Sequence, residues 1–186
     1  EKYVGVHLRG GRVWNKAGVE GGQYVRQRHT AECVRGLMVQ TLECAERLAA
    51  RAEALVASRE VTGVYVASDL RQQDMPEMQT PAMDPPYVTV EERGSLLAVM
   101  GEARHVLLDA LEGVSFPSHT LPDPVGMGAL IDAELLGGAE VFVHAGQQPG
   151  KCEPTGYGES IVRKRRDKGL ENATTEYIGD CCVPGC

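Results

Sequence analysis

The order of the first predicted elements restricts the fold more than any other feature of the chain. Residues 3–8 form an apolar, strand-like run, and from about Ala31 to Ser58 apolar residues recur at spacings of three and four. That spacing predicts a long amphipathic helix, with Thr30 placed to cap its first turn. A β-branched run at Val61–Ala67 follows and is short enough for a buried strand. Strand, helix and strand in this order predict a βαβ unit.

The rest of the chain continues the alternation, after a proline-rich loop at 72–86. Further elements are expected as follows: a strand at Tyr87–Val90, helices within Glu91–Leu111 and at about Met127–Leu136, a strand at Glu140–His144, and a basic helix from about Glu159 that closes the ordered part. Alternating strands and helices predict an α/β fold, with a parallel sheet covered by helices on both faces. We expect one domain over residues 1–170 and a cysteine-rich tail over 171–186.

Composition and charge restrict the partners. The chain has 186 residues, 42% of them hydrophobic, which suffices for one domain with a buried core. Its net charge of −7 argues against a general nucleic-acid binder. Basic residues gather in 1–28 and 163–168, on either side of an acidic middle. If folding brings the two clusters together, they would suit a small polyanion. If they lie on separate solvated faces, they need no ligand, and the charge pattern leaves both possibilities open.

The cysteines favour an oxidising compartment, because six are many for a cytosolic chain of this size: Cys33, Cys44, Cys152, Cys181, Cys182 and Cys186. A zinc site is the alternative, although the tail has no histidine in ligand spacing. Cys33 and Cys44 on one helix would lie roughly 16 Å apart and cannot pair. Asn172-Ala173-Thr174 is an N-glycosylation sequon and agrees with a lumenal or secreted location.

No window approaches the roughly 18 apolar residues of a membrane-spanning helix, and the first residues form no signal peptide. Because the sequence enters a strand almost at once, we expect an N-terminal segment to precede it in the full protein. Any membrane anchor would lie in a segment outside this chain.

Polar residues stand at the ends of three predicted strands. His7 and Arg9 end the first, Ser68 and Asp69 the second, and His144 the late strand. Ligands of parallel α/β sheets bind outside the carboxyl ends of the strands, so these residues are site candidates. His7 and Arg9 leave the same face of an extended strand and present an imidazole beside a guanidinium fork suited to phosphate. Neither the dinucleotide-binding nor the P-loop glycine motif occurs. His144 receives no role.

Four segments, in order, resemble GDP-fucose fucosyltransferases, and most closely the protein O-fucosyltransferases and their plant-type relatives. They are Val4–Arg9, Val64–Asp69, Gly128–Leu136 with Ala139–Val143, and Val162–Asp167. The resemblance spans nearly the whole chain and corresponds to the C-terminal, nucleotide-sugar-binding half of the two-domain GT-B fold. It implies a Rossmann-like parallel sheet with helices on both faces, and an N-terminal half, absent from this sequence, that binds the acceptor.

The resemblance also implies roles for individual residues. His7 and Arg9 would contact the sugar nucleotide, with Arg9 gripping the β-phosphate. Arg9 is therefore the expected catalytic residue, because a fixed cation stabilises the departing diphosphate without a metal. The remaining GDP-fucose contacts would be Ser68, Asp69, Ser160 and Arg166, with Lys164 as an alternative register.

The implied activity is transfer of fucose from GDP-fucose, with inversion, to a protein or glycan acceptor in the lumen of the endoplasmic reticulum or Golgi. It requires no cofactor or metal. The third motif departs from the family, because residues 144–148 read His-Ala-Gly-Gln-Gln where a Gly-Asn and a serine-rich turn are usual. Two alternatives follow: another nucleotide-sugar transferase of the same architecture, or a non-catalytic lumenal binding module with a degenerate donor site.

Each candidate residue also has a structural interpretation that the sequence leaves open. Arg9 would pair with an acid on the sheet rim, and His7 would be a hydrogen-bonded core histidine. Asp69 would cap a helix. The basic run Arg163–Arg166 would be a solvated helix face.

Overall fold

The computed structural model describes residues 2–8, 31–58, 60–68, 98–99, 101–109, 111, 127–145, 156–170 and 174–179. Its centre is a four-stranded sheet in which every neighbouring pair is parallel. The strands are β1 (Tyr3–Leu8), β2 (Gly63–Ser68), β3 (Val141–His144) and β4 (Thr175–Tyr177), in the spatial order β2-β1-β3-β4. The predicted α/β class with a parallel sheet is confirmed for the described part of the chain.

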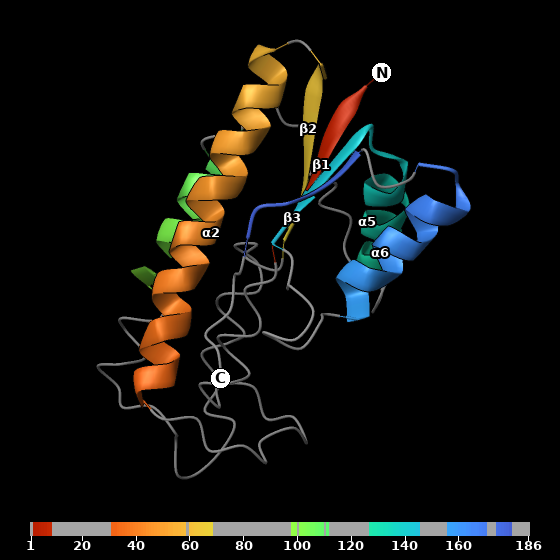
Figure 1. Cartoon of the computed structure of the whole chain (residues 1–186). Helices are drawn as coiled ribbons and strands as arrows, with labels where there is room; N and C mark the ends of the chain where they lie inside the picture. Colours follow the sequence, from red (N-terminus) through yellow and green to blue (C-terminus); the bar gives the residue numbers. More distant parts are fainter. Residues whose placement is uncertain are drawn as a thin grey trace.

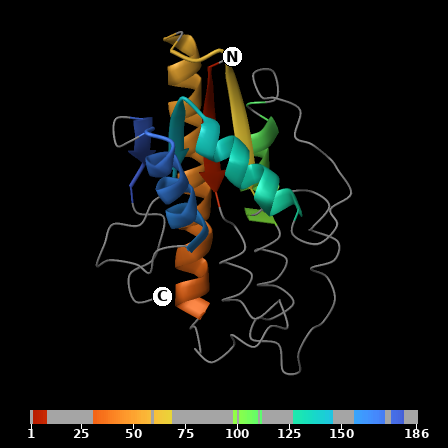
Figure 2. The same cartoon turned by 90° about the vertical axis from the view of Figure 1, so that its right-hand side faces the viewer.

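Helices cover both faces of the sheet. The long helix α2 (Ala31–Ala57) and the π-helical segment η1 (His105–Asp109) lie on one face, and α5 (Met127–Gly138) and α6 (Gly156–Asp167) lie side by side on the other (Figures 1 and 2). Side chains alternate along β1, so Val4 and Val6 enter the core beneath α2 while Gly5 and His7 face α5 and α6. Two apolar cores, one on each face, therefore hold the sheet between the helical layers.

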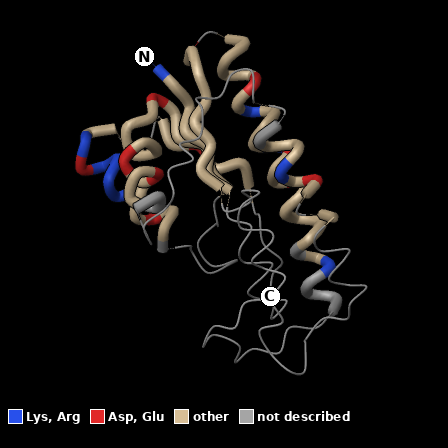
Figure 3. The backbone as a smooth tube through the Cα atoms, turned by 180° about the vertical axis from the view of Figure 1, so that it is seen from behind, with Lys and Arg blue, Asp and Glu red and all other residues tan. Residues whose placement is uncertain are grey.

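Basic residues are not spread evenly over the helices. Lys and Arg positions gather toward the end of α6 and recur along α2, and these two helices lie on opposite sides of the sheet (Figure 3). Among the described residues, no helix has both the length and the apolar composition that crossing a bilayer requires.

Glycine at position 5 lets α5 lie directly against the sheet. A Cβ added there would come within 3.0 Å of both the Cβ of Ala139 and the Cδ2 of Leu136, closer than carbon atoms pack. The hydroxyl of Tyr3 donates a 2.7 Å hydrogen bond to the carbonyl of Leu135 on the same helix. The end of α5 is thus fixed against β1 by close packing and by a polar contact.

The most buried charged side chain of the described residues is Arg165 in α6, which is 1% exposed. Its guanidinium donates to the carbonyls of Ala139 (2.6 Å) and Thr174 (3.1 Å) and to the hydroxyl of Thr174 (2.6 Å), among other acceptors, and lies over the ring of Phe142. Desolvation lowers its pKa, an effect that nearby Tyr3 and Glu140 oppose. Arg165 therefore joins α6 to the segments that lead into β3 and β4.

Strand β4 was not expected from the sequence. It follows the boundary at residue 170 that we expected to end the domain, yet it pairs with β3 in the same sheet. Ile178, just after it, packs against the core beneath α2. Within the expected helix Glu91–Leu111, residues 98–99 and 101–104 are α-helical and η1 is a π-helix. The strand expected at Tyr87–Val90 lies outside the described residues.

Candidate functional site

The order of the strands marks one position on the sheet. From β1 the chain passes through α2 to β2 on one side, whereas β3 lies on the other side of β1. The crossover connections that flank β1 and β3 therefore lie on opposite faces of the sheet. A crevice at such a switch point, outside the carboxyl ends of the strands, is where open parallel sheets bind ligands. In this chain that position is the carboxyl end of β1 and β3.

Three ring-bearing side chains form a row across this end of the sheet. His7 of β1 is in register with His144 of β3, which is in register with Tyr177 of β4. Residues in register in a parallel sheet project from the same face, and this face is the one covered by α5 and α6. The Tyr157 ring, in the first turn of α6, lies 5.1 Å from the His7 ring. The row and Tyr157 together make up the candidate site.

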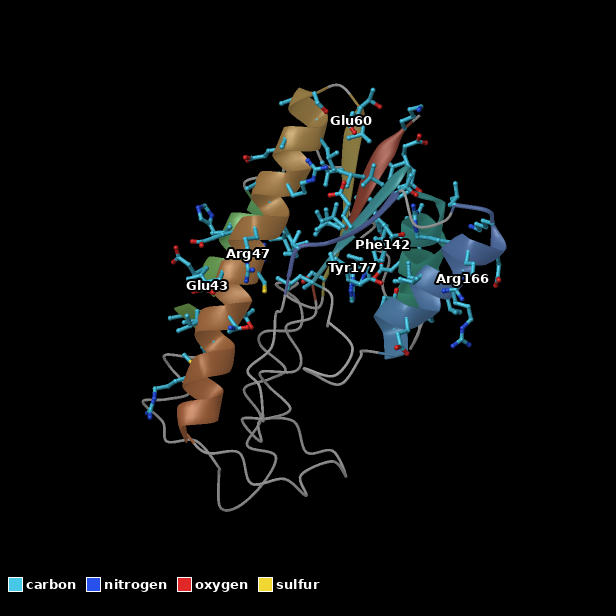
Figure 4. The ribbon with its side chains drawn as sticks, viewed as in Figure 1. Glu43, Arg47, Glu60, Phe142, Arg166 and Tyr177 are labelled. Carbon is cyan, nitrogen blue, oxygen red and sulfur yellow. The ribbon has the colours of Figure 1, made fainter. Side chains whose placement is uncertain are left out.

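His144 occupies the centre of the row and is 6% exposed. Its ring stacks on Phe142 at 4.8 Å and meets Tyr177 at 4.4 Å; Figure 4 labels both neighbours. Desolvation by this burial lowers the pKa of His144 to about 4, so the imidazole is neutral at pH 7. Its Nε2 atom is buried and has no hydrogen-bond partner among the residues that the structure describes. Such an atom is costly to bury unless something satisfies it, and a ligand at this edge can do so.

The first turn of α6 lies at the same end of the sheet as the row (Figure 1). Because α6 leads from the carboxyl end of β3 to the start of β4, its amide dipoles point their positive end toward the carboxyl ends of the strands. Backbone N–H groups at a helix start favour anions such as phosphate. Together with the neutral His144, this arrangement suits a ligand that carries an uncharged polar group beside a negatively charged one.

Two of the predicted site residues lie at this edge. His7 is in the row and is 8% exposed. Ser68, the last residue of β2, is buried and in register with Leu8, so its side chain leaves the opposite face, toward α2. The ends of β1 and β2 thus lie side by side, but the side chains of His7 and Ser68 point to different faces of the sheet. Arg9 and Asp69, which follow them directly, lie outside the described residues.

The candidates on α6 are spread along the helix. Ser160 is exposed near its start, and its hydroxyl donates to the Tyr157 carbonyl at 2.7 Å, one turn from the row. Arg166 is exposed near the helix end and stands on the outer side, well apart from Tyr177 (Figure 4). Lys164 pairs with Glu134 of α5. The structure therefore connects Ser160, but not Arg166 or Lys164, to Tyr157, whose ring is the neighbour of His7.

Sequence reasoning missed two members of this arrangement and gave a third no role. His144 was a strand-end candidate without a role, although it stands near the end of its strand as His7 does. Tyr157 and Tyr177 carried no motif. Within the described ranges, no group of three or more His, Cys, Asp and Glu side chains is arranged to hold a metal ion.

Comparison with known proteins adds no assignment, because no family model matches the chain and no curated protein sequence is a match.

Proposed function

We propose that this chain is the donor-binding half of a GT-B fucosyltransferase and that GDP-fucose binds at the carboxyl end of β1 and β3. The proposal is supported by the ordered motifs that resemble the GDP-fucose fucosyltransferases. The single observation that carries it in the fold is the switch point between β1 and β3, with His7 in the row of rings there.

The chemistry follows from the residues at and beside that edge. Transfer of fucose with inversion breaks the bond between the sugar and the β-phosphate, so negative charge develops on the departing GDP. Arg9, one residue after β1, is the cation that we assign to this charge, and the helix start of α6 adds its dipole. Asp69 would hold the guanosine, and Ser160 would serve the phosphate side. The acceptor and its general base would belong to the N-terminal half of the enzyme.

Titration calorimetry tests the proposal, with GDP, GDP-fucose, GDP-mannose and UDP as ligands and the full-length enzyme alongside this chain. We expect the guanosine ligands to bind and UDP not to bind. Arg9→Ala should weaken GDP binding about 10- to 100-fold, the usual effect of losing one charge-assisted contact. Arg163→Ala, an exposed arginine of α6, is the matched control and should bind as the wild type does.

Three outcomes would count against the proposal. Equal affinity for UDP and GDP would favour another nucleotide-sugar transferase. Tight GDP-mannose binding without GDP-fucose binding would do the same. A folded full-length protein that binds no nucleotide sugar would favour a non-catalytic lumenal module.

A further inference from the structure

Cys44 lies in the middle of α2 and is fully buried in the core between that helix and the sheet. Its sulfur forms a disulfide bond in the structure. Its partner is not Cys33, because both lie in the unbroken helix α2 and their Cα atoms are about 16 Å apart. A disulfide requires Cα atoms within about 7 Å of each other. The partner is therefore one of the four cysteines that follow residue 150.

Arg47, one turn along α2 from Cys44, connects this cysteine to the end of β4. Its Nη2 lies 3.7 Å from the Cys44 Sγ, and its Nη1 donates a 3.3 Å hydrogen bond to the carbonyl of Ile178. A Cβ built on Gly179 would lie 3.1 Å from the same Nη1. One guanidinium group thus touches both the sulfur of Cys44 and the backbone at residues 178–179.

Two cysteines follow this contact almost at once. Cys181 is two residues and Cys182 three residues beyond Gly179, so their Cα atoms lie at most about 7 Å and about 11 Å from it. We propose that the disulfide of Cys44 is formed with one of this adjacent pair, Cys181 or Cys182. Its formation removes two protons and two electrons from the thiols, and a protein or low-molecular-weight disulfide such as oxidised glutathione accepts them.

The other two candidates have weaker support. Cys152 stands four residues before α6, and α6 lies across the sheet from α2 (Figure 2). Cys186 is seven residues beyond Gly179, so the contact at Arg47 does not restrict where it lies.

The proposed bond would reinforce an existing attachment of β4 to α2. Arg51, one turn beyond Arg47, holds both carboxylate oxygens of Glu176 at 2.6 and 2.7 Å. The two arginines hold β4 against α2 through side-chain contacts, and the disulfide would link the same two segments covalently. Because β4 carries Tyr177, the bond would also help to hold Tyr177 against His144. This inference does not depend on the proposed function.

Peptide mapping under non-reducing conditions tests the pairing on the unaltered protein. Free thiols are alkylated at acidic pH and the Asn172 sequon is enzymatically deglycosylated before digestion. Trypsin separates Cys33, Cys44 and Cys152 onto peptides 29–35, 36–47 and 152–163, and leaves the three tail cysteines on 169–186. Electron-transfer fragmentation, which breaks disulfides, then assigns the partner of Cys44 even within a multiply linked product.

We expect peptide 36–47 to be linked to 169–186 at residue 181 or 182, both in the wild type and in Cys186→Ser. In Cys44→Ser, one of these two cysteines should become available for alkylation. The proposal is overturned by a link from 36–47 to 152–163, by loss of the link in Cys186→Ser, or by recovery of Cys44 in alkylated form.

Discussion

Replacing His144 by phenylalanine tests the burial of this imidazole quantitatively. In the unfolded chain the group titrates near pH 6.5, whereas burial lowers its pKa to about 4 in the folded protein. Between these values the unfolded chain binds a proton that the folded chain does not, so stability falls as the pH falls from 6.5 toward 4. Integration between the two pKa values gives a loss of about 2 kcal/mol at pH 5 relative to pH 8.

His144→Phe keeps a ring between Phe142 and Tyr177 but cannot take up a proton. Urea unfolding at pH 8 and pH 5 measures the effect, because every other titrating group is common to the two proteins. We expect the wild type to lose about 2 kcal/mol more than the variant over this interval. At pH 8 the variant should be at least as stable, since it no longer buries the unpartnered Nε2 atom. Parallel pH profiles in the two proteins would show that the histidine is not held neutral by burial.

Two further predictions concern packing, and each has a matched control. Arg165→Ala should lower the free energy of unfolding, measured by urea titration, by about 3 kcal/mol or more, because it leaves buried carbonyls without their donor. The exposed Arg166→Ala should change it by less than about 0.5 kcal/mol. Equal effects of the two substitutions would contradict this assignment. Gly5→Ala should cost about 1–3 kcal/mol through overlap with α5, whereas Gly101→Ala, which meets open space in a helical turn, should be neutral or slightly stabilising. A thermally unaltered Gly5→Ala protein would refute the close approach.

The long-range architecture was predictable where local patterns were strong. The apolar spacing over residues 31–58 predicted α2, and the β-branched run before Ser68 predicted β2. Each of these signals lies within a single element. Its apolar residues fall where that element is buried against the rest of the fold. The strand-end rule likewise selected His7 from sequence, and His7 is found at the switch point.

The basic run in α6 shows where local reading falls short. Four consecutive basic residues, Arg163 to Arg166, gave no direct sign of which one faces inward. A signal was nevertheless present: Ile161 is buried, and one helical turn later stands Arg165. Charge suggested that all four residues belong to a binding or solvated face. Arg165 is buried nevertheless, because the buried carbonyls that precede β3 and β4 need hydrogen-bond donors. Only the fold brings these carbonyls and Arg165 together.

Strand β4 has no comparable local signal, because its three residues, Thr-Glu-Tyr, are too few to show a pattern. It is held instead by arginines from both helical layers: Arg165 of α6 at its start, and Arg51 and Arg47 of α2 along and beyond it. These contacts join residues more than a hundred positions apart on the α2 side, so no window of sequence could show them. Since Tyr177 of this strand packs on His144, the outer wall of the candidate site depends on these polar attachments. Loosening β4 should therefore expose His144 to water.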